Sequence, residues 1–411
     1  MAAGSRYTSR MDDRQDMPPD DVLNTQLIQR CNPGLSDFGA GSVIALSSQC
    51  LRSAKLATAC SICIDACPAN ALRANSLQRP SFTKDCLKCG YCISICPVNA
   101  ITATTKTIQQ IIRVLLQSTL RVSQLTLTCN RSLALLRLAA ESLQGEEATA
   151  ALAHLLEAEK SDNLYVVPCL AMLSSELWFT LLNEIGISAV DEILVFLPFG
   201  QCELCPVNDK EGAVDAFSAA IDTAEQWSGQ TVTIVSSASQ VPQYRKADLR
   251  GYLADASQTD RRSVFTGLLD ELKRSWDDTN RTGNRAADEA LMARARRETI
   301  NRTVLADDLP SLAAGQVKPV LSVFRQALVE AIGRNPSNAG HVSLLASETD
   351  TSLCDACGSC VDACPLKARQ IVSGKAYADP LYCLGCSACL QICPKQACSF
   401  IRISGQIFLR E

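Results

Sequence analysis

The central part of the chain alternates between strand-like and helix-like stretches of hydrophobic residues. The strand-like stretches, which are short and apolar or alternate with polar residues, lie at 122–128, 164–167, 193–197 and 231–235. The helix-like stretches carry apolar residues at spacings of three and four and lie at 133–143, 174–185 and 213–227. Strands that alternate with helices in this way predict a parallel sheet covered by helices.

A second region, closer to the C-terminus, has only helical periodicity. Residues 261–277 form an amphipathic pattern, with apolar side chains on one face of the expected helix. A further helix is expected at 319–332, where Pro319 would open it and Gly333 would stop it. These patterns predict a helical connector over 241–345.

The composition indicates a packed globular protein of several domains. The chain has 411 residues, of which 47% are hydrophobic and 20% are charged. Its formal net charge of -4 provides no basic excess for a nucleic-acid partner. No apolar run reaches the roughly 18 residues that a bilayer-spanning helix needs, and residues 1–20 lack the apolar stretch of a secretory signal. We therefore expect a cytoplasmic protein without direct membrane insertion.

Cysteine is the residue that sets this composition apart. There are 22 cysteines but only two histidines, His154 and His341. Disulfide-rich proteins are usually small and secreted, which does not fit a chain of this length without a secretory signal. Reduced thiols that bind metal fit better, and the scarcity of histidine argues against a bis-histidine haem site.

The C-terminal end carries the same cysteine spacing twice. Each run has three cysteines separated by two residues each, and a fourth that follows after three residues and precedes a proline. The runs are Cys354, Cys357, Cys360 and Cys364, and then Cys383, Cys386, Cys389 and Cys393. In this bacterial ferredoxin spacing the fourth cysteine ligates the cluster of the other run. The expected ligand sets are therefore Cys354, Cys357, Cys360 and Cys393 for one cluster, and Cys364, Cys383, Cys386 and Cys389 for the other.

Zinc is the main alternative, because cysteines separated by two residues also make tetrahedral zinc sites. A zinc ion takes four ligands in two pairs. The third cysteine and the Cys-Pro ending of each run would then have no role, so the spacing favours iron–sulfur clusters over zinc.

The N-terminal part of the chain repeats the pattern. Seven cysteines each lie 297 positions before a cysteine of the C-terminal runs, as Cys60 does before Cys357. The seven are Cys60, Cys63, Cys67, Cys86, Cys89, Cys92 and Cys96. One N-terminal cluster would be held by Cys67, Cys86, Cys89 and Cys92. The same offset aligns Cys398 with Ile101, so we expect Cys398 to fill an apolar position rather than to bind metal.

The repeat breaks at one ligand, because the counterpart of Cys354 is Ala57. The second N-terminal set consists of Cys60, Cys63 and Cys96 and lacks a fourth thiol. Cys50, seven residues before Ala57, is the nearest candidate, and Cys31 is farther away. Alternatively, Cys50 is a small buried hydrophobe, and a three-iron cluster or a non-cysteine ligand completes the site.

Both ends of the chain resemble bacterial two-cluster ferredoxins of the 2[4Fe-4S] type. The resemblance covers roughly residues 50–105 and 353–402. It implies compact βαββαβ modules and one-electron transfer at low potential through four [4Fe-4S] clusters. We place the two dicluster modules at 46–110 and 346–411, after an N-terminal extension over 1–45.

Four further cysteines follow the strands predicted for the central domain, which we place at 118–240. Cys129 and Cys169 follow the first and second strands, and Cys202 and Cys205 follow the third. Ligands of open α/β sheets lie beyond the carboxyl ends of the strands, so these thiols should meet at one edge. They suit a cluster or a metal ion. The alternatives are a redox dithiol at Cys202 and Cys205, or simple burial.

The central domain also resembles the delta-subunit family of methyl-viologen-reducing hydrogenases, which carries an iron–sulfur cluster. The resemblance rests on a Val-x-Cys at 167–169 and a Gly-x-Cys at 200–202. That family's other cysteines would fall near Ser132 and Leu197, and Cys205 is additional. The type of any cluster in this domain is therefore left open.

Taken together, the patterns predict a multidomain α+β and α/β protein, with two ferredoxin-like modules around a parallel α/β domain. We expect an iron–sulfur electron-transfer subunit that relays single electrons between a donor or acceptor and a catalytic oxidoreductase partner. One alternative is a redox enzyme with its centre among the central cysteines, which would need a reactive thiol of low pKa. Another is an oxygen or redox sensor with a labile N-terminal cluster, although no DNA-binding motif accompanies it.

Overall fold

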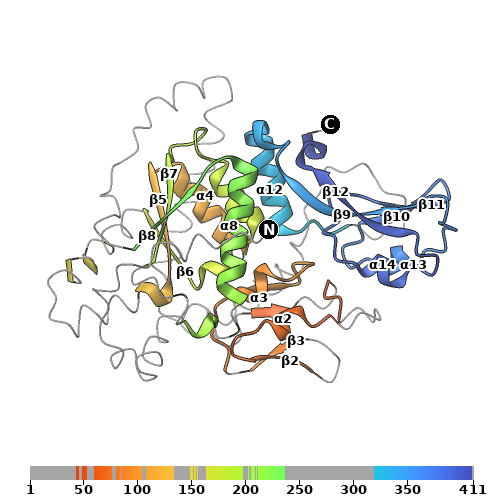
Figure 1. Cartoon of the computed structure of the whole chain (residues 1–411), viewed down its shortest axis with the longest axis horizontal. Helices are drawn as coiled ribbons and strands as arrows, with labels where there is room; N and C mark the ends of the chain where they lie inside the picture. Colours follow the sequence, from red (N-terminus) through yellow and green to blue (C-terminus); the bar gives the residue numbers. More distant parts are fainter. Residues whose placement is uncertain are drawn as a thin grey trace, which may run out of the picture. The chain divides into compact units, whose positions relative to one another are not determined.

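The structure is a computed structural model, drawn in Figure 1. It describes residues 43–45, 49–52, 60–75, 80–83, 85–103, 108–133, 149–150, 152–153, 155, 163–197, 202, 205–208, 210, 212–236 and 319–409. The helix expected at 261–277 and most of the one expected at 133–143 lie outside these residues, as do Cys31 and Ala57.

The central domain contains a four-stranded parallel sheet, as the alternation of its sequence predicts. The strands are β5 (Gln124–Cys129), β6 (Leu164–Val167), β7 (Glu192–Phe196) and β8 (Val232–Val235), in the order β6-β5-β7-β8 (Figure 1). Strand β5, the first of the four along the chain, lies between β6 and β7, the second and the third. Successive connections therefore run to opposite sides of β5, which creates a topological switch point at the carboxyl ends of β5 and β7.

The two faces of the sheet pack into different cores because side chains alternate along a strand. On β7, Ile193 and Val195 belong to the large core that also contains the helices, whereas Leu194 and Phe196 pack on the other face with Leu155. The longer helices of the large core are α4 (Ile108–Thr119), α7 (Ser175–Leu182), α8 (Gly212–Ser228) and α12 (Val323–Arg334).

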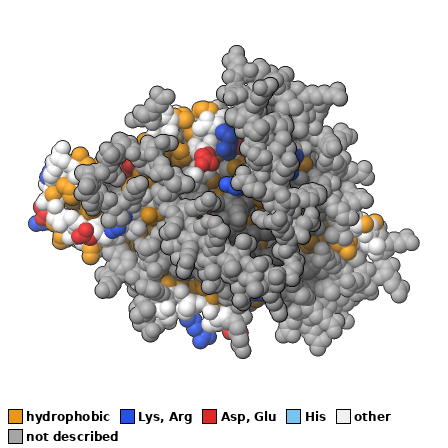
Figure 2. Space-filling model, turned by 180° about the vertical axis from the view of Figure 1, so that it is seen from behind, with side chains coloured by type: hydrophobic (Ala, Val, Ile, Leu, Met, Phe, Trp, Pro, Cys, Tyr) orange, Lys and Arg blue, Asp and Glu red, His pale blue; other side chains and the backbone are white. Residues whose placement is uncertain are grey.

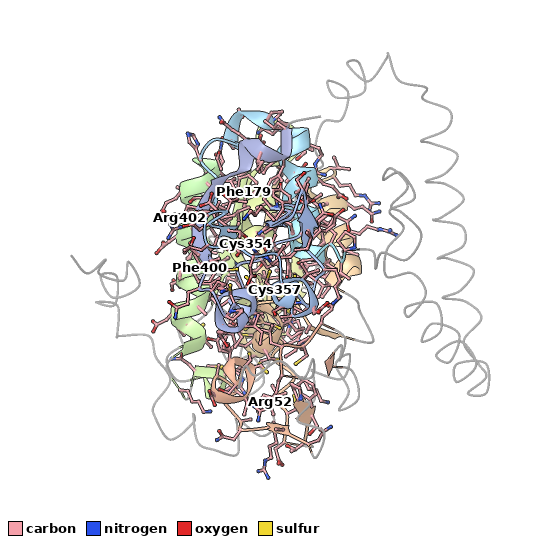
Figure 3. All side chains as sticks on the ribbon, turned by 90° about the vertical axis from the view of Figure 1, so that its right-hand side faces the viewer. Arg52, Phe179, Cys354, Cys357, Phe400 and Arg402 are labelled. Atoms are coloured by element: carbon pink, nitrogen blue, oxygen red, sulfur yellow. The ribbon has the colours of Figure 1, made fainter. Side chains whose placement is uncertain are left out.

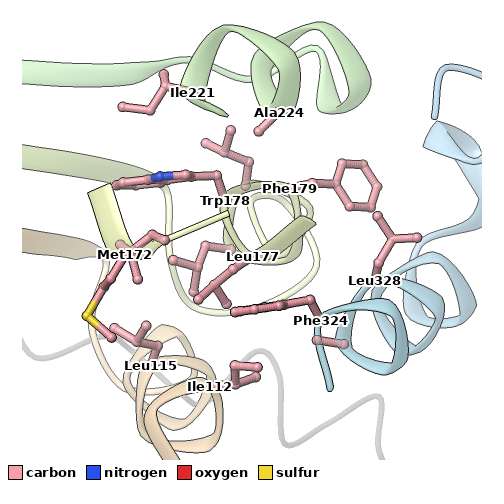
Figure 4. Close-up of a cluster of buried hydrophobic side chains, with 14 of the residues drawn as sticks. Ile112, Leu115, Met172, Leu177, Trp178, Phe179, Ile221, Ala224, Phe324 and Leu328 are labelled. Atoms are coloured by element: carbon pink, nitrogen blue, oxygen red, sulfur yellow. The ribbon is translucent and has the colours of Figure 1, made fainter. Parts of the chain in front are cut away.

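Helix α7 is the centre of this large core (Figure 4). Its residues Trp178 and Phe179 are completely buried. The Phe179 ring meets Trp227 of α8 edge to face, with 6.0 Å between the ring centroids. Phe324 and Leu328 of α12 are buried in the same core (Figure 4). Each large side chain in such a core stabilises the fold by roughly 1.5–3 kcal/mol, so α7 joins elements from distant parts of the sequence.

The N-terminal module has the element order βαββαβ that its ferredoxin resemblance implies. Its elements are β1 (Val43–Ala45), α2 (Ile62–Asp65), β2 (Leu72–Ala74), β3 (Pro80–Phe82), α3 (Tyr91–Ser94) and β4 (Ile101–Ala103). Strand β1 pairs with β4 and β2 pairs with β3, both antiparallel. The two strand pairs bring the first and second halves of the module together, which crossed ligation of two clusters requires.

The C-terminal module repeats this order. Its elements are β9 (Ser343–Thr349), α13 (Ser359–Asp362), β10 (Arg369–Val372), β11 (Lys375–Ala378), α14 (Ala388–Ile392) and β12 (Cys398–Ser404). Strand β9 pairs with β12 and β10 pairs with β11, again antiparallel. The outer pair is longer than in the N-terminal module, and a short 3₁₀ helix, η11 (Gly405–Leu409), follows it.

The N-terminal module packs against the carboxyl edge of the central sheet. The hydroxyl of Tyr91 donates a hydrogen bond to the carbonyl oxygen of Gly212 over 2.9 Å, and Ser94 donates one to the carbonyl oxygen of Ala171 over 2.5 Å. A Cβ added at Gly90 would lie 3.0 Å from the Cβ of Met172, and Gly90 has a φ of 76°. Only glycine suits both the left-handed backbone and this close approach.

Helix α12 differs in its bounds from the expected helix at 319–332. It begins at Val323 because the side chain of Ser322 accepts a hydrogen bond from the Arg325 N–H and caps it. Pro319 therefore lies outside the helix. Gly333 lies inside it, since the helix continues to Arg334 and its C-cap is Asn335. The expected start and stop signals were wrong because the serine cap and the buried packing of the helix outweigh them.

Arg325 of α12 joins three parts of the fold, although it is almost fully buried. Its Nε pairs with Glu176 of α7 at 3.4 Å. Its Nη1 donates to the carbonyl oxygens of Pro380 and Cys383 in the C-terminal module at 3.0 and 3.3 Å. The guanidinium also lies over the ring of Phe408, 5.7 Å from its centroid. A buried charge of this kind is stable only because all these partners are present.

No helix in the described part of the chain is both long enough and apolar enough to cross a membrane. On the face shown in Figure 2, lysine and arginine side chains lie among aspartate, glutamate and apolar side chains of the described residues. This mixture agrees with the small net charge of the sequence.

Replacing Arg325 tests the connection made by α12. We expect Arg325→Leu to lower the free energy of unfolding by about 3 kcal/mol, because Glu176 would keep a poorly hydrated charge without its partner. The control is Gln326→Ala on the exposed side of the same helix, which should change stability by less than about 0.5 kcal/mol. Anaerobic urea unfolding, followed by tryptophan fluorescence, measures both. Equal effects of the two substitutions would contradict this role of Arg325.

Candidate metal centres

All four Cys-Pro turns of the two modules have the same local geometry. In each, the cysteine sulfur accepts a hydrogen bond from the backbone N–H of an alanine four residues later. The pairs are Ala71 with Cys67 (3.3 Å), Ala100 with Cys96 (3.2 Å), Ala368 with Cys364 (3.2 Å) and Ala397 with Cys393 (3.3 Å). The residue before each alanine has a positive φ, as Asn70 has at 49°, which turns the N–H back toward the sulfur. Such bonds stabilise a thiolate and tune a cluster that it ligates.

The loops between the other cysteines also use left-handed backbone. In three of the four runs, one residue between the first two cysteines and the residue after the second have positive φ. These residues are Lys88 and Gly90, Ala356 and Gly358, and Gly385 and Ser387. In the remaining run the corresponding residue is Ser61, which follows Cys60 and has a φ of −125°. The backbone thus departs from the repeat in the run that lacks its first cysteine.

Two of the predicted ligand sets each line a single cavity. One cavity is lined by Cys67, Cys86, Cys89 and Cys92, together with Cys63. The other is lined by Cys354, Cys357, Cys360 and Cys393, together with Cys398. Cys354 and Cys357 of this second set are labelled in Figure 3. In both cavities the fourth cysteine comes from the other run, which is the arrangement that crossed ligation predicts.

The third set gathers at the second half of the C-terminal module. The pKa of the Cys386 thiol is raised by burial and, in addition, by the charges of Cys364, Cys383 and Cys389. Cys383 and Cys389 also meet Ser347 of β9, whose N–H donates to the Cys383 sulfur over 3.4 Å and whose hydroxyl lies 3.1 Å from the Cys389 sulfur. A hydroxyl and an amide therefore support two members of this set, which sequence spacing alone did not indicate.

The structure brings Cys50 to the incomplete set. Cys50 belongs to a buried cluster against which Cys60 and Cys96 pack. The charge of Cys50 also contributes to the raised pKa of Cys63 and of Cys96. Arg52, labelled in Figure 3, donates from Nη1 to the carbonyl oxygen of Cys60 over 3.3 Å. The segment after Cys50 thus returns to the loop of Cys60, and four thiols meet where the repeat of cysteines had only three.

Strand register explains how Cys50 can replace the missing ligand. Ala45 of β1 pairs with Ile101, and Thr349 of β9 pairs with Cys398, the counterpart of Ile101. The interval from Ala45 to Cys50 equals the interval from Thr349 to Cys354, five residues in each. Measured from the strands, Cys50 therefore occupies the position of Cys354, and the N-terminal loop to the next cysteine is seven residues longer. Its assignment as a ligand stays a prediction.

The thiols of these sets are held in surroundings that disfavour a bare thiolate. Burial, assisted by neighbouring thiolate charges, raises the pKa of Cys63, Cys89 and Cys386 to about 12. The chain without metal would therefore keep these thiols protonated at neutral pH. Iron displaces these protons when it binds, so the sites fit a cationic metal group better than free thiolates.

Cys398 lies closer to a metal centre than the sequence suggested. It lines the cavity of the Cys354 set, and its side chain hydrogen-bonds to Cys393. Burial raises the pKa of Cys398 to about 12, so its thiol keeps the proton that it can donate. Its apolar neighbours in the C-terminal module include Ala376, which agrees with the expected packing role. Cys398 thus packs in the core and contacts a predicted ligand.

The central cysteines also meet, at the carboxyl edge of the sheet. Cys129 is the last residue of β5, Cys169 lies two residues after β6, and Cys205 follows β7. Burial raises the pKa of Cys169 well above its usual value, and the thiolate charges of Cys89, Cys129 and Cys205 add to this effect. Cys202 is joined to this group through the turn in which the Cys205 N–H donates to its carbonyl oxygen. The thiols therefore meet at the topological switch point, where such sheets bind ligands.

Polar side chains that the sequence reasoning missed surround the central cysteines. Arg131 donates from Nη1 to the Cys205 sulfur over 3.1 Å. Ser132 lies 3.1 Å from the Cys129 sulfur with its hydroxyl and 3.3 Å with its backbone nitrogen. Their position just after β5, in the first turn beyond a strand-end cysteine, is the signal that could have identified them.

Neighbouring ligand sets lie close to one another, as shared packing and mutual effects on thiol pKa values indicate. The buried cluster of Cys50, Cys60 and Cys96 also includes Ala388 and Cys386 of the C-terminal module. Within the modules, the charge of Cys63 contributes to the raised pKa of Cys92, and the charge of Cys389 contributes to the raised pKa of Cys360. At the other end Cys89 acts on Cys169 of the central domain. Each set therefore has another set as its neighbour.

Comparison with protein-family models identifies both modules. Residues 58–101 and residues 347–394 match models described as 4Fe-4S dicluster domains. The chain contains two 4Fe-4S dicluster domains. Together with the cavities lined by cysteine, they show that it binds [4Fe-4S] clusters and has an iron–sulfur electron-transfer role. Among the described residues, no group of three or more His, Cys, Asp or Glu side chains converges on a point as ligands of one metal ion would.

Comparisons with curated proteins and with solved structures gave no match. The resemblance of the central domain to the hydrogenase delta-subunit family therefore stays a prediction. Cys50 lies before the first matched stretch, so its assignment rests on strand register and on its neighbours.

Replacing Cys50 tests whether it completes the N-terminal set. We expect Cys50→Ala to lower the iron content by about four per chain, or by about one if a three-iron cluster remains, because one cubane loses a thiolate. The measurement is iron and sulfide content after anaerobic purification, with EPR of the oxidised and reduced protein.

The matched control is Leu51→Ala, which removes a buried side chain from the same cluster without removing a thiol. It should keep the full iron content. An unchanged iron content and EPR spectrum in Cys50→Ala would show that Cys50 is a packing residue.

Proposed function

We propose that this protein is an electron-transfer subunit that relays single electrons along one series of centres. The series begins at the central cysteines, continues through the two N-terminal sets, and passes through the two C-terminal sets. Its partners are a catalytic oxidoreductase subunit and an electron donor or acceptor. When bound, the clusters supply the one-electron chemistry, while the chain provides ligands, burial and hydrogen bonds.

The observation that carries this proposal is that Ala388 and Cys50 belong to one buried cluster, against which Cys60, Cys96 and Cys386 all pack. Two separate ferredoxin modules could each exchange electrons with different partners. Instead, a ligand set of one module shares a buried apolar cluster with a ligand set of the other. A small side chain such as Ala388 allows the close approach, and exclusion of water keeps the surroundings of both sets apolar. The contact supports a single relay through both modules.

The outer end of the relay is argued from exposure. Among the described cysteines, Cys357 alone is exposed, and all the others are buried or half-buried. Cys357 belongs to the set that lies farthest along the series from the central domain. A set with one exposed thiol offers a partner the shortest approach, so we infer that a redox partner docks at this end of the C-terminal module.

The redox-enzyme alternative receives support from one contact. The Arg131 guanidinium donates a hydrogen bond to the Cys205 sulfur, so a cation lies beside one of the candidate reactive thiols. The same contact would also favour Cys205 as a cluster ligand, since ligands bind metal as thiolates. The two functions therefore differ in what the central cysteines bind, which can be measured.

Counting electrons tests the relay. We expect the fully loaded chain, reduced with dithionite and desalted without air, to deliver about four electrons to a one-electron dye acceptor, one for each cubane. A fifth centre in the central domain would add to this number. An iron-loaded chain that accepts and delivers no electrons would refute the proposal.

The double variant Cys202→Ser with Cys205→Ser separates the two functions. A relay that begins in the central domain loses the additional centre but keeps the electrons of the four cubanes. A redox enzyme keeps its cubanes and its dye reduction but loses turnover of its own substrate. Gln226→Ala on the exposed face of α8 is the control, because it changes the central domain without removing a thiol, and it should keep all the centres.

A further inference from the structure

Arg369 is a buried cation in the middle of the C-terminal module. It is the first residue of β10 and is only 3% exposed. One terminal nitrogen donates to the hydroxyl of Ser347 over 2.6 Å, and the other donates to the hydroxyl of Thr349. Its Nε has no acceptor among the described residues. Both hydroxyls belong to β9, so the guanidinium is fixed between β9 and the start of β10.

The groups around Arg369 that can carry negative charge are sulfurs. The guanidinium hydrogen-bonds to the side chains of Cys360 and Cys389. Cys360 belongs to one predicted ligand set of the module and Cys389 belongs to the other. Ser347, which accepts from Arg369, also lies 3.1 Å from the Cys389 sulfur. One cation therefore reaches thiols of both sets.

A cation in this position is costly unless negative charge compensates for it. No aspartate or glutamate in the described part of the chain forms an ion pair with Arg369. The unpartnered Nε also needs an acceptor. Cysteinyl thiolates and the sulfides of bound clusters provide both the charge and the acceptor, so the site fits two ligated clusters with Arg369 between them.

The N-terminal module lacks this cation. The counterpart of Arg369 at the offset of 297 is Leu72, which is also buried and also begins the second strand of its module. The N-terminal module does have Lys88, whose charge acts on Cys86. Lys88, however, is half-buried and in contact with water, which weakens its interaction with the cluster. Arg52 brings a further half-buried cation to the loop of Cys60. The two modules thus share their ligand pattern and differ in a fully buried charge at the position of Arg369.

We propose that Arg369 sets the potentials of the C-terminal module, by holding a positive charge between its two ligand sets and so making this module the stronger electron acceptor of the two. The inference rests on the proposed function, since it concerns the same clusters. A bound cluster would take up one electron from a partner on reduction, and no bond would form or break. The added electron makes the cluster more negative, and a nearby fixed cation stabilises this reduced state. Because Arg369 is shielded from water, its charge acts with little screening.

The test is a potentiometric titration of the full-length, iron-loaded chain, followed by EPR. In Arg369→Leu, which copies the N-terminal residue, two of the one-electron steps should become harder. We expect the ratio of reduced to oxidised cluster at a fixed potential to fall at least tenfold for these steps, which corresponds to a shift of about 59 mV for a one-electron couple. Arg369→Lys keeps a charge and should recover most of the shift. The reciprocal variant Leu72→Arg should raise two other steps.

Iron and sulfide content, measured on every variant, separates the possible outcomes. A wild-type chain without clusters or without electron uptake would refute the proposed function itself. Unchanged potentials in a fully loaded Arg369→Leu chain would overturn the role of Arg369 alone. Arg369→Gln serves as a second neutral variant if the leucine variant does not fold. Loss of the C-terminal clusters from both neutral variants, with full loading in Arg369→Lys, would assign the charge to cluster assembly and would also overturn the proposal.

Discussion

The structure depends on which groups balance the negative charge of its buried cysteine sulfurs. Thiolates are stable in a protein interior only when protons, metal ions or hydrogen-bond donors balance their charge. Each Cys-Pro turn meets this requirement with one amide, because a residue of positive φ directs the next alanine N–H at the sulfur. The other ligands lie on short loops and helices whose burial raises their pKa, so that iron rather than solvent stabilises them. The modules are therefore small folds whose interior is organised around sites for clusters.

Duplication has preserved this arrangement while allowing two kinds of change. The first is a change in chain length: the loop after Cys50 is seven residues longer than its counterpart, yet strand pairing brings Cys50 to the place of Cys354. The prediction that Cys50 is a ligand thus rests on its distance from the preceding strand and not on its distance from the next cysteine. The second is a change in charge: Arg369 stands where the other module has Leu72. The backbone geometry of the four Cys-Pro turns is thus the same in both modules, whereas the run of Cys60 and the side chain that begins the second strand differ.

The sequence predicted those features that depend on short-range patterns. Cysteine spacing predicted the four thiols of each set that lines a cavity, because three of them lie in one short run and the crossed-ligation pattern supplies the fourth. It did not predict that Cys63 and Cys398 line these cavities as well. Apolar runs predicted β6 and the other strands of the central sheet within a residue or two. Helix α4 was missed, although Ile108, Ile111, Ile112 and Leu115 show helical spacing and are buried. The packing of Ala388 against Cys50 and the burial of Arg369 could not be predicted, because both depend on segments that are far apart in the sequence.

The central domain is included in the proposed electron relay because of its position beside the N-terminal module more than because of its own residues. Its thiols gather at the switch point of a parallel sheet, a general location for ligands that does not by itself specify electron transfer. The N-terminal module packs on this same edge, and Gly90 lets the loop of Cys89 approach Met172, three residues after Cys169. An electron centre at this edge would have a dicluster domain as its nearest neighbour. A substrate at this edge would instead have to enter beside the packed module. The packing of the loop of Cys89 on this edge therefore favours transfer between centres over an independent active site.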